Sequence, residues 1–342
     1  MILAGIDIGT NTLRLLVVET GPHAFQEIYT DRRITRLGQD LDRNGRLSPE
    51  AEERTLRALV DFSAQIRRYS AFRSAAIGTS ALRNAANSAA FLHEVLMRTG
   101  LDVRIVSGAE EARLTLLGVA RMLGQGGGRK NGAALASAFV IDIGGGSTEI
   151  IATRPGMTPH IASLPLGAVY LTDRFIRNDP PLPEELVRLR QAIGSELDGF
   201  AETIQRRPDS VFIGTAGTIT TLAAIDQGLL SYDPARINHA VLTREFIDAT
   251  VDQLSASTLD ERRSIRGLER GREDIILAGA MVAQEIMRRF GYASMLVSDW
   301  GLREGIVLDL YEQIVAQAAA KSPGQQSPLR QEPGIARRGK QD

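Results

Sequence analysis

Apolar runs rich in Val, Ile and Leu alternate with longer amphipathic stretches along this chain, and the alternation predicts an α/β protein. The expected strands cover residues 2–8, 13–20, 25–29, 74–78, 102–106, 139–152 (a hairpin), 160–164, 210–214 and 294–298. The expected helices cover residues 49–68, 81–98, 107–123, 168–176, 183–205, 243–254, 272–290 and 302–319, with another helix starting near residue 215. The order of elements in the first half recurs in the second half.

Two of the expected helices carry clear end signals. Ser48, Pro49 and Glu50 are typical of a helix start, because Ser caps free amides, Pro suits the first turn and acids favour the positive end of the helix dipole. Gly100 is expected to end the helix over 81–98, since glycine readily adopts the left-handed conformation of a C-terminal cap.

Two tight bends stand out among the polar positions. Asp7-Ile8-Gly9 follows one apolar strand, and Asp142-Ile143-Gly144 follows another strand 135 residues later (142 − 7). Glycine has no Cβ atom, so the main-chain N–H groups of such a bend can approach an anion closely. A single Gly-rich hairpin is more often a structural turn. The repeated Asp-Ile-Gly core instead favours an internal duplication in which two lobes hold phosphate between them.

The second bend also carries groups that suggest a cation. Ser147 and Thr148 add hydroxyl donors, whereas Asp142 and Glu149 would repel a phosphate group unless a divalent cation lay between them. A further strand opens into the Gly- and Thr-rich stretch 214–222, where free N–H groups at a helix start suit an anion. The residue types therefore predict a site for phosphate and a metal ion.

The chain is expected to divide into two lobes and a tail. Lobe I covers residues 1–124 together with a closing helix at about 306–320, and lobe II covers 133–305. The glycine-rich stretch 124–132 is interpreted as a flexible connection between them. The tail 321–342 is rich in Pro, Gln, Gly and charged residues and is expected to be disordered.

Composition narrows the functional classes. The chain is 43% hydrophobic and 24% charged with a formal net charge of −1, so no global basic field indicates nucleic-acid or membrane binding. The absence of cysteine excludes disulfides, Cys-ligated metals and a thiol nucleophile. No apolar run approaches the length of a membrane span, and no signal peptide is evident at the first residues, so a cytoplasmic protein is expected.

Several segments together resemble the exopolyphosphatase / guanosine pentaphosphate phosphohydrolase (Ppx/GppA) family, within the actin–hexokinase–Hsp70 superfamily. These segments are 5–12, 78–85, 107–114, 140–150, 163–168, 214–222 and 297–305. The resemblance implies two ribonuclease-H-like (actin-like ATPase) lobes with a central cleft between them. Larger members carry additional C-terminal helical domains that lengthen the substrate groove, so processive digestion of very long polyphosphate is not expected of this chain.

The same resemblance assigns roles to individual residues. Glu111 is implied to activate water, and Asp142 and Glu149 are implied to serve the metal; Asp7, at the matching position of the first bend, is assigned to the same ion. The implied phosphate-binding residues are Gly9, Thr10, Asn11, Thr12 and Arg83. The second bend and the 214–222 stretch add Gly144, Gly145, Gly146, Ser147, Thr148, Gly214, Thr215 and Gly217 as phosphate-binding candidates.

Structural explanations compete with some of these assignments. An acid in the first turn of a helix is favoured by the helix dipole, which alone would account for Glu111. Asp7 and Asp142 could be turn formers, although the duplication argues against this. Surface or packing roles are expected for Arg32, Arg33, Arg36, Arg272 (paired with nearby acids), Trp300 (near the lobe interface) and the four histidines.

The leading hypothesis is a Mg²⁺-dependent phosphohydrolase, with Mn²⁺ as a substitute, that releases terminal phosphate from inorganic polyphosphate, from guanosine pentaphosphate or from both. Guanosine tetraphosphate is expected as a further binding partner. One alternative is an ATP-dependent kinase of the same superfamily, although the Glu-Glu-Ala-Arg segment at 110–113 has no place in a kinase. A second alternative is a non-catalytic alarmone-binding sensor. No nucleic-acid or membrane partner is expected, and a homodimer is allowed.

Overall fold

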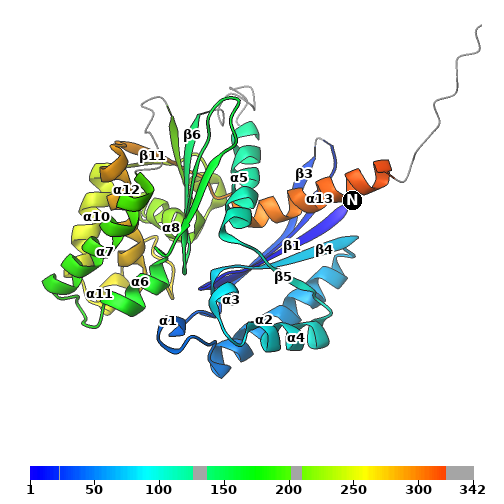
Figure 1. Cartoon of the computed structure of the whole chain (residues 1–342), viewed down its shortest axis with the longest axis horizontal. Coiled ribbons are helices and arrows are strands. Elements are labelled where there is room, and N and C mark those ends of the chain that lie inside the picture. The colour runs from blue at the N-terminus through cyan, green and yellow to red at the C-terminus, as the bar shows by residue number, and fades with distance from the viewer. Residues whose placement is uncertain (23, 126–136, 202–209, 321–342) are drawn as a thin grey trace, which may run out of the picture.

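The computed structural model describes residues 1–22, 24–125, 137–201 and 210–320. The expected tail and nearly all of the glycine-rich connection lie outside the described residues. The described part forms two mixed sheets with helices on both faces of each, which confirms the expected α/β architecture of two lobes (Figure 1).

The first sheet has five strands in the spatial order β3-β2-β1-β4-β5. Its strands are β1 (Ile2–Ile8), β2 (Thr12–Thr20), β3 (Phe25–Ile34), β4 (Arg73–Gly78) and β5 (Val103–Ile105). The first three pair antiparallel, and β1, β4 and β5 pair parallel. Alternate residues of β2 face different cores, Leu13 and Leu15 on one side and Leu16 and Val18 on the other, because successive side chains of a strand point to opposite faces.

Helices cover the outer face of this sheet. They are α2 (Pro49–Arg68), α3 (Ser80–Asn84) and α4 (Ser88–Thr99), and the short α1 (Leu41–Asn44) follows β3. Ser48 caps α2 as expected, since its side chain accepts a hydrogen bond from the Ala51 N–H at 3.2 Å. We call this sheet with its helices lobe I.

The prediction of one helix over 81–98 is wrong. The helix breaks at Ala85, which has extended backbone, and α4 begins three residues later. The Asn87 side chain accepts a hydrogen bond from the Leu47 N–H at 2.8 Å and donates one to the Leu47 carbonyl at 3.1 Å. This contact with a distant loop overrides the local helical pattern. The strand β3 is likewise longer than expected, because it continues through the basic residues that follow Tyr29.

The second sheet has six strands in the order β10-β11-β9-β6-β7-β8. Its strands are β6 (Ala138–Ile143), β7 (Thr148–Ala152), β8 (His160–Leu164), β9 (Val211–Thr215), β10 (Val241–Thr243) and β11 (Ser294–Val297). Read in reverse, β8-β7-β6-β9-β11 repeats the order and strand directions of the first sheet, and β10 is added at the edge. The two sheets therefore have the internal symmetry that the repeated bends predicted.

The helices of this second lobe, which we call lobe II, surround the largest apolar core. They are α6 (Ala168–Phe175), α7 (Pro183–Ala201), α8 (Ala216–Asp226), α9 (Pro234–Ile237), α10 (Arg244–Ala256), α11 (Leu259–Arg262) and α12 (Ile276–Phe290). The helix expected from Arg272 begins only at Ile276. The residues before it form tight turns, in which the Arg272 N–H bonds the Glu269 carbonyl and the Ile275 N–H bonds the Arg272 carbonyl. The short elements α9, α11 and β10 were not predicted.

Two long helices, α5 (Gly108–Gln125) and α13 (Leu302–Ala320), lie between the sheets (Figure 1). On α13, Val307 and Leu310 pack against Leu3, Leu16 and Val18 of the first sheet. On α5, the buried residues Ala112 and Val119 pack against the second sheet. Each sheet is thus covered on its inner face by one helix of this pair.

Glycines allow α5 and α13 to cross at close range. A Cβ atom added to Gly118 would lie 2.0 Å from the Gly301 carbonyl oxygen. A Cβ atom added to Gly305 would lie 1.9 Å from the Leu114 carbonyl oxygen. Real Cβ atoms do not approach main-chain oxygens so closely, so the crossing requires glycine on both helices.

Candidate functional site

The two predicted bends have the same hydrogen bond at the ends of equivalent strands. Between β1 and β2 the Gly9 N–H donates to the Thr12 carbonyl at 3.1 Å, and between β6 and β7 the Gly144 N–H donates to the Ser147 carbonyl at 3.0 Å. The bends are therefore the same local structure in each lobe.

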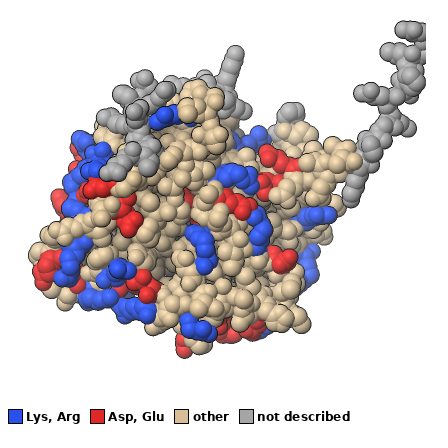
Figure 2. Space-filling model, viewed as in Figure 1, with Lys and Arg blue, Asp and Glu red and all other residues tan. Residues whose placement is uncertain are grey.

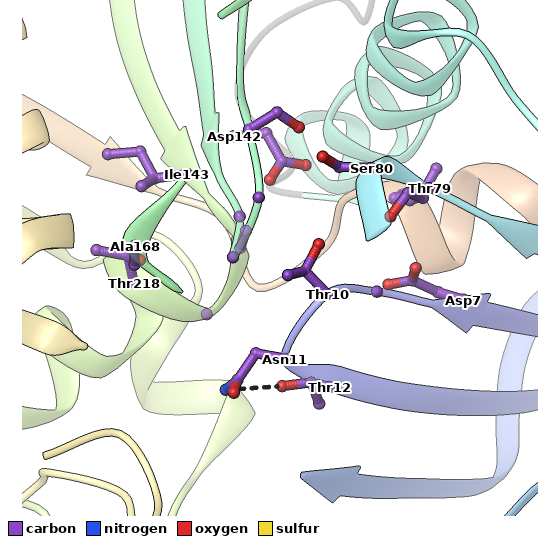
Figure 3. A pocket seen from close by; sticks show the side chains of 18 of the residues that line it. Asp7, Thr10, Asn11, Thr12, Thr79, Ser80, Asp142, Ile143, Ala168 and Thr218 are labelled. Atoms are coloured by element: carbon purple, nitrogen blue, oxygen red, sulfur yellow. Dashed lines mark hydrogen bonds between the residues drawn. The ribbon is translucent and has the colours of Figure 1, made fainter. Parts of the chain in front are cut away.

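The bends face and touch each other across the interface between the lobes. A Cβ atom on Gly145 would lie 3.0 Å from the Thr10 Cβ atom. A Cβ atom on Gly146 would lie 2.7 Å from the Thr10 hydroxyl and 2.5 Å from the Ser80 hydroxyl. In Figure 3, Thr10 and Ser80 point into the space that Asp142 enters from the other lobe. Glycine is required in the second bend because any side chain would meet lobe I.

A cavity of about 70 Å³ lies at this contact. Main-chain amides of the bends, hydroxyl groups and carboxylates form its walls, as expected of an anion and cation site. The predicted site residues that line it are Asp7, Gly9, Thr10, Asn11, Thr12, Glu111, Asp142, Gly144, Gly145, Gly146, Ser147 and Gly217. Those that do not line it are Arg83, Thr148, Glu149, Gly214 and Thr215.

Three of the residues outside the cavity wall make structural contacts. The Thr148 hydroxyl donates to the Leu166 carbonyl at 2.7 Å, and the Thr215 hydroxyl donates to the Trp300 carbonyl at 3.0 Å. Gly214 is packed so tightly that a Cβ atom there would lie 2.3 Å from the Met295 sulfur. These residues hold the second bend and the start of α8 in place.

Glu111 lies in the first turn of α5 with its side chain buried at the cavity. Arg83 donates from Nη1 to Glu111 Oε2 at 3.1 Å and to the Val106 carbonyl at 2.8 Å. Burial raises the pKa of the Glu111 carboxyl well above its usual value; the nearby Glu149 and Asp142 raise it further, and Arg83 opposes them. Glu111 is thus a buried carboxyl group whose orientation Arg83 fixes.

Two other buried carboxylates at the site, Asp142 and Glu149, accept hydrogen bonds from hydroxyl groups. Asp142 Oδ2 accepts a hydrogen bond from Thr115 at 3.0 Å. Glu149 Oε1 accepts from Ser147 at 2.9 Å and from Ser163 at 2.7 Å, and burial raises the pKa of this carboxyl to about 7.

Asp7 differs from these residues. Burial raises its pKa to about 6, and its buried Oδ1 atom has no hydrogen-bond partner among the described residues. Buried polar atoms are normally paired, so an unpaired oxygen that lines a cavity points to a ligand.

The donor set fits a hard divalent cation. Carboxylate oxygens are the ligands that Mg²⁺ prefers, and Asp7 and Asp142 bring them to one cavity from two lobes. Within the described residues, no three or more His, Cys, Asp or Glu side chains are arranged as a ready-made ion cage. Mg²⁺ does not require one, because it commonly takes one or two carboxylates and completes its shell with water and substrate oxygens.

The basic residues on and just after β3, which were expected on a solvated face, make ion pairs. Arg33 pairs with Asp31 at 2.8 Å within lobe I. Arg32 pairs with Glu269 at 2.7 Å, so it links lobe I to lobe II. Arg36 also reaches lobe II, where its two terminal nitrogens bond the carboxylate of Asp274 at 2.8 and 2.9 Å. Trp300 packs on Phe25 of lobe I with ring centroids 4.8 Å apart.

Sequence reasoning missed several residues at the cavity. Arg272 forms the expected ion pair with Glu269, at 2.7 Å, but it is only 5% exposed, lines the cavity and reaches the Thr12 hydroxyl at 3.5 Å. Arg14 lines the cavity from β2, and a charge between the apolar residues Leu13 and Leu15 was the available signal. The additional lining residues that were not named individually as candidates are Arg14, Thr79, Ser80, Ile143, Ala168, Ala216, Thr218, Arg272, Ile275 and Leu302.

The start of α8 shows a second unpredicted feature. Ala216 has a φ of 69°, a left-handed conformation that costs energy for a residue with a side chain and is concentrated at functional sites. The adjacent Gly217 leaves room for Arg272, since a Cβ atom there would lie 2.5 Å from the guanidinium nitrogens.

Basic and acidic side chains are interspersed on the side seen in Figure 2, so this face has no large patch of positive or negative charge. Among the helices of the described residues, none is both long and apolar enough to cross a bilayer.

Comparisons with known proteins identify similar chains. The profile of the Ppx/GppA phosphatase family matches residues 16–314. Exopolyphosphatase 2 of Mycobacterium tuberculosis is 32% identical over 321 residues, which cover 90% of this chain and 98% of that protein. Exopolyphosphatase 1 of Mycobacterium leprae is 31% identical over 313 residues, which cover 90% of this chain and 89% of that protein.

Solved structures are similar as well. The crystal structure of the Aquifex aeolicus member of the Ppx/GppA family has a TM-score of 0.75 at 32% identity, and the match covers 93% of this chain and 98% of that one. An exopolyphosphatase-like protein has a TM-score of 0.84 at 29% identity, with 92% and 100% of the two chains covered.

Proposed function

This chain belongs to the Ppx/GppA phosphatase family, and we propose that it is a Mg²⁺-dependent phosphohydrolase that releases terminal phosphate from inorganic polyphosphate, from guanosine pentaphosphate or from both. The observation that supports this proposal most directly is the buried Glu111 carboxyl group, which Arg83 orients at a cavity where two phosphate-type bends meet. Exopolyphosphatases among the relatives make polyphosphate the first substrate to test.

Hydrolysis of a phosphoanhydride depends mainly on charge stabilisation and on placement of the attacking water. The amides of the two bends and the hydroxyls of Thr10 and Thr12 supply donors for phosphoryl oxygens. Because these donors come from both lobes, they bind the phosphate only when the lobes are together.

Glu111 supplies the base. Arg83 occupies its Oε2 atom, which leaves Oε1 to accept a proton from water as the water oxygen bonds to phosphorus and the bridging P–O bond breaks. A raised pKa makes this carboxylate a stronger base than an exposed glutamate. Arg83 acts here as a positioning residue that holds the carboxylate.

Asp7 and Asp142 would hold the metal ion at the cavity wall. Glu149 accepts a hydrogen bond from Ser147 and would serve the same ion from behind the second bend. A bound Mg²⁺ neutralises phosphate charge. Without it, the buried carboxylates would repel the substrate, so chelation should remove phosphate release.

The proposal is tested by phosphate release from purified protein with Mg²⁺, offered tripolyphosphate, long polyphosphate, guanosine pentaphosphate and ATP in parallel, with and without a chelator. Chelator-sensitive release from either of the first two substrates or from the pentaphosphate supports it. Transfer from ATP to an added acceptor would indicate a kinase, and tight binding of guanosine pentaphosphate without any release would indicate a sensor. Either result would overturn the proposal.

A further inference from the structure

The helix α5 carries two buried polar side chains on one face, Glu111 and Thr115. Side chains four residues apart in a helix are neighbours on its surface, one turn apart. Glu111 bonds Arg83 of lobe I, whereas the Thr115 hydroxyl donates a hydrogen bond to Asp142 Oδ2 of lobe II at 3.0 Å. One turn of a single helix therefore contacts site residues of both lobes.

The hydrogen bond of Thr115 differs from those of other buried threonines in helices. A helical threonine can donate to the main-chain carbonyl four residues earlier in its own helix. The threonines that do so here include Thr55, Thr99, Thr221 and Thr250. Thr115 is fully buried as well, but it donates to a carboxylate of the other lobe. Its hydroxyl therefore serves Asp142 rather than its own helix.

Asp142 is buried near the end of β6, directly opposite Glu149 on β7, and it lines the cavity. Thr115 occupies its Oδ2 atom, and the described part of the chain offers no other hydrogen bond to this carboxylate. A carboxylate held through one oxygen has little freedom to rotate, so the direction of the other oxygen is fixed too. Oδ1 is thus the atom left for a metal ion.

Mg²⁺ and Ca²⁺ use carboxylates in different ways. Mg²⁺ requires nearly octahedral geometry with ligands at about 2.0–2.1 Å, whereas Ca²⁺ takes 6–8 oxygens at about 2.3–2.6 Å and can bind both oxygens of one carboxylate. A carboxylate with one oxygen already bonded to a hydroxyl suits the first mode. Without Thr115, Asp142 would have both oxygens available and would suit the second mode better.

We propose that Thr115 is a positioning residue, which holds Asp142 so that a single carboxylate oxygen meets the metal ion, and that it thereby favours Mg²⁺ over Ca²⁺. This inference rests on the proposed phosphohydrolase function and adds a determinant of its metal preference. Because Thr115 and Glu111 share one turn of α5, the same contact fixes Asp142 relative to the base. In the structural alternative, Thr115 only satisfies a buried carboxylate, and metal binding does not depend on it.

Metal binding by the substrate-free protein tests the inference, since it requires no turnover. Mn²⁺ is titrated while the electron paramagnetic resonance signal of the free ion is recorded, and Mg²⁺ or Ca²⁺ is then added to displace it. Thr115→Val keeps the branched shape but removes the donor. It should weaken binding of Mn²⁺ and Mg²⁺ about 10- to 100-fold, the range for loss of a hydrogen-bond partner of a metal ligand. The affinity for Ca²⁺ should fall by a smaller factor.

Two further variants separate the hydroxyl from the shape of the side chain. Thr115→Ser keeps the donor without the methyl group and should restore most of the Mn²⁺ affinity. Thr55→Val removes an equally buried helical hydroxyl that lies outside the cavity wall, so it should leave metal binding unchanged.

The active protein gives a second measurement. With Thr115→Val, the Mg²⁺ concentration for half-maximal phosphate release from tripolyphosphate should rise by a factor similar to the loss of Mg²⁺ affinity. Added Ca²⁺ should inhibit this variant more strongly than the parent, because the preference for Mg²⁺ is reduced.

Several results would overturn the inference. They are unchanged Mn²⁺ affinity of Thr115→Val, an equal loss of affinity for Mg²⁺ and Ca²⁺, a Thr115→Ser protein as weak as Thr115→Val, and no Mn²⁺ binding by the unmodified protein. If Thr115→Val does not fold, as judged by its thermal unfolding, Thr115→Ala takes its place.

The failure of the proposed function is a separate outcome. If the unmodified protein releases no phosphate from any substrate, the proposed function fails, whereas the Mn²⁺ titration still decides on Thr115. Normal phosphate release with unchanged metal binding by the Thr115 variants rejects only this inference.

Discussion

Glu110 and Glu111 are neighbours in the first turn of α5, and their surroundings give them different roles. Glu110 forms an ion pair with Arg104 at the surface. Glu111 is buried at the cavity and bonded to Arg83. The helix dipole acts on both residues, so it does not explain why only Glu111 is buried near Glu149 and Asp142.

Replacing Glu111 with Gln should lower kcat for phosphate release about 10²- to 10⁴-fold, because it removes the base that accepts the water proton. Tripolyphosphate binding should persist, since the amide keeps the shape of the side chain. Glu110→Gln is the matched control and should change kcat less than twofold. Phosphate release by a steady-state assay decides, and comparable rates for the two variants would remove Glu111 from the mechanism.

Asp299 gives a residue-scale prediction about stability. Its carboxylate accepts a hydrogen bond from the Tyr232 hydroxyl, and burial raises its pKa above the usual value. In the unfolded chain the pKa of this carboxyl is about 4. The folded protein therefore holds its proton to higher pH, and stability falls as pH rises between the two pKa values.

Asp299→Asn should remove this part of the pH dependence while keeping an acceptor for Tyr232. Urea unfolding between pH 4 and 8 should show that the variant gains stability relative to the unmodified protein as pH rises. The exposed Asp260→Asn serves as the control. A constant difference between variant and parent at every pH would contradict the expected titration.

Site residues could be predicted from the sequence where the functional side chains belong to one short, continuous segment. Asp7, Thr10 and Asp142 are in bends whose glycines mark them. Arg272 was not assigned to the cavity, because it reaches it only through the contact between lobes. Arg14 was missed although it follows the first bend on β2, because the strand pairing that sets it opposite Asp7 is not part of the bend. A local pattern carries no information on which distant residue lies opposite.

At the scale of elements, the crossing of α5 and α13 connects both lobes. Gly118 and Gly305 bring the two helix backbones together, and the α13 residues near this point also pack on β1. Helices that meet through small residues have little room to adjust, so this crossing fixes the distance between the two sheets.

Gly305→Ala should destabilise the protein by about 2–4 kcal/mol, because its methyl group would collide with the Leu114 carbonyl. Gly194→Ala in α7 is the matched control: nothing lies within 4 Å of the added methyl, so helix propensity should stabilise it by roughly 0.5–1 kcal/mol. Chemical denaturation measures both. A Gly305→Ala protein as stable as its parent would show that the crossing can relax.

Most helices and strands could be predicted from hydrophobic periodicity and helix-end signals. The elements that were predicted wrongly depend on contacts with distant parts of the chain. The strands around both bends could be placed within one or two residues, since their apolar runs are buried on both faces. The break between α3 and α4 depends on Asn87 bonding a distant loop, and the late start of α12 follows turns before a buried helix. Neither interaction is visible in a local window of sequence.

At the scale of the whole molecule, three ion pairs among the described residues join lobe I to lobe II. Arg32 bonds Glu269, Arg36 bonds Asp274, and Arg174 lies 3.5 Å from Asp42. Partly exposed pairs of this kind contribute up to about 1 kcal/mol each. That energy is suited to an equilibrium between open and closed lobes, because it favours closure without preventing opening.

Asp274→Asn should shift this equilibrium toward the open form, since it weakens the two hydrogen bonds from Arg36. Small-angle scattering of the ligand-free variant should give a larger radius of gyration, and tripolyphosphate with Mg²⁺ should restore the value of the parent. Asp198→Asn, whose partner Arg289 lies in the same lobe, is the control. Identical scattering curves for all proteins, with and without ligand, would argue against hinge closure.

The interleaved path of the chain has a consequence for its synthesis. The strand β1 is translated long before α13, which buries Leu3, Leu16 and Val18 and follows the whole second sheet in the chain. Until α13 has been made, this apolar face of the first sheet is not covered by its native partner helix, and such exposed faces bind chaperones or aggregate. The sheet of lobe I therefore gains its inner cover only after the strands of lobe II have been made.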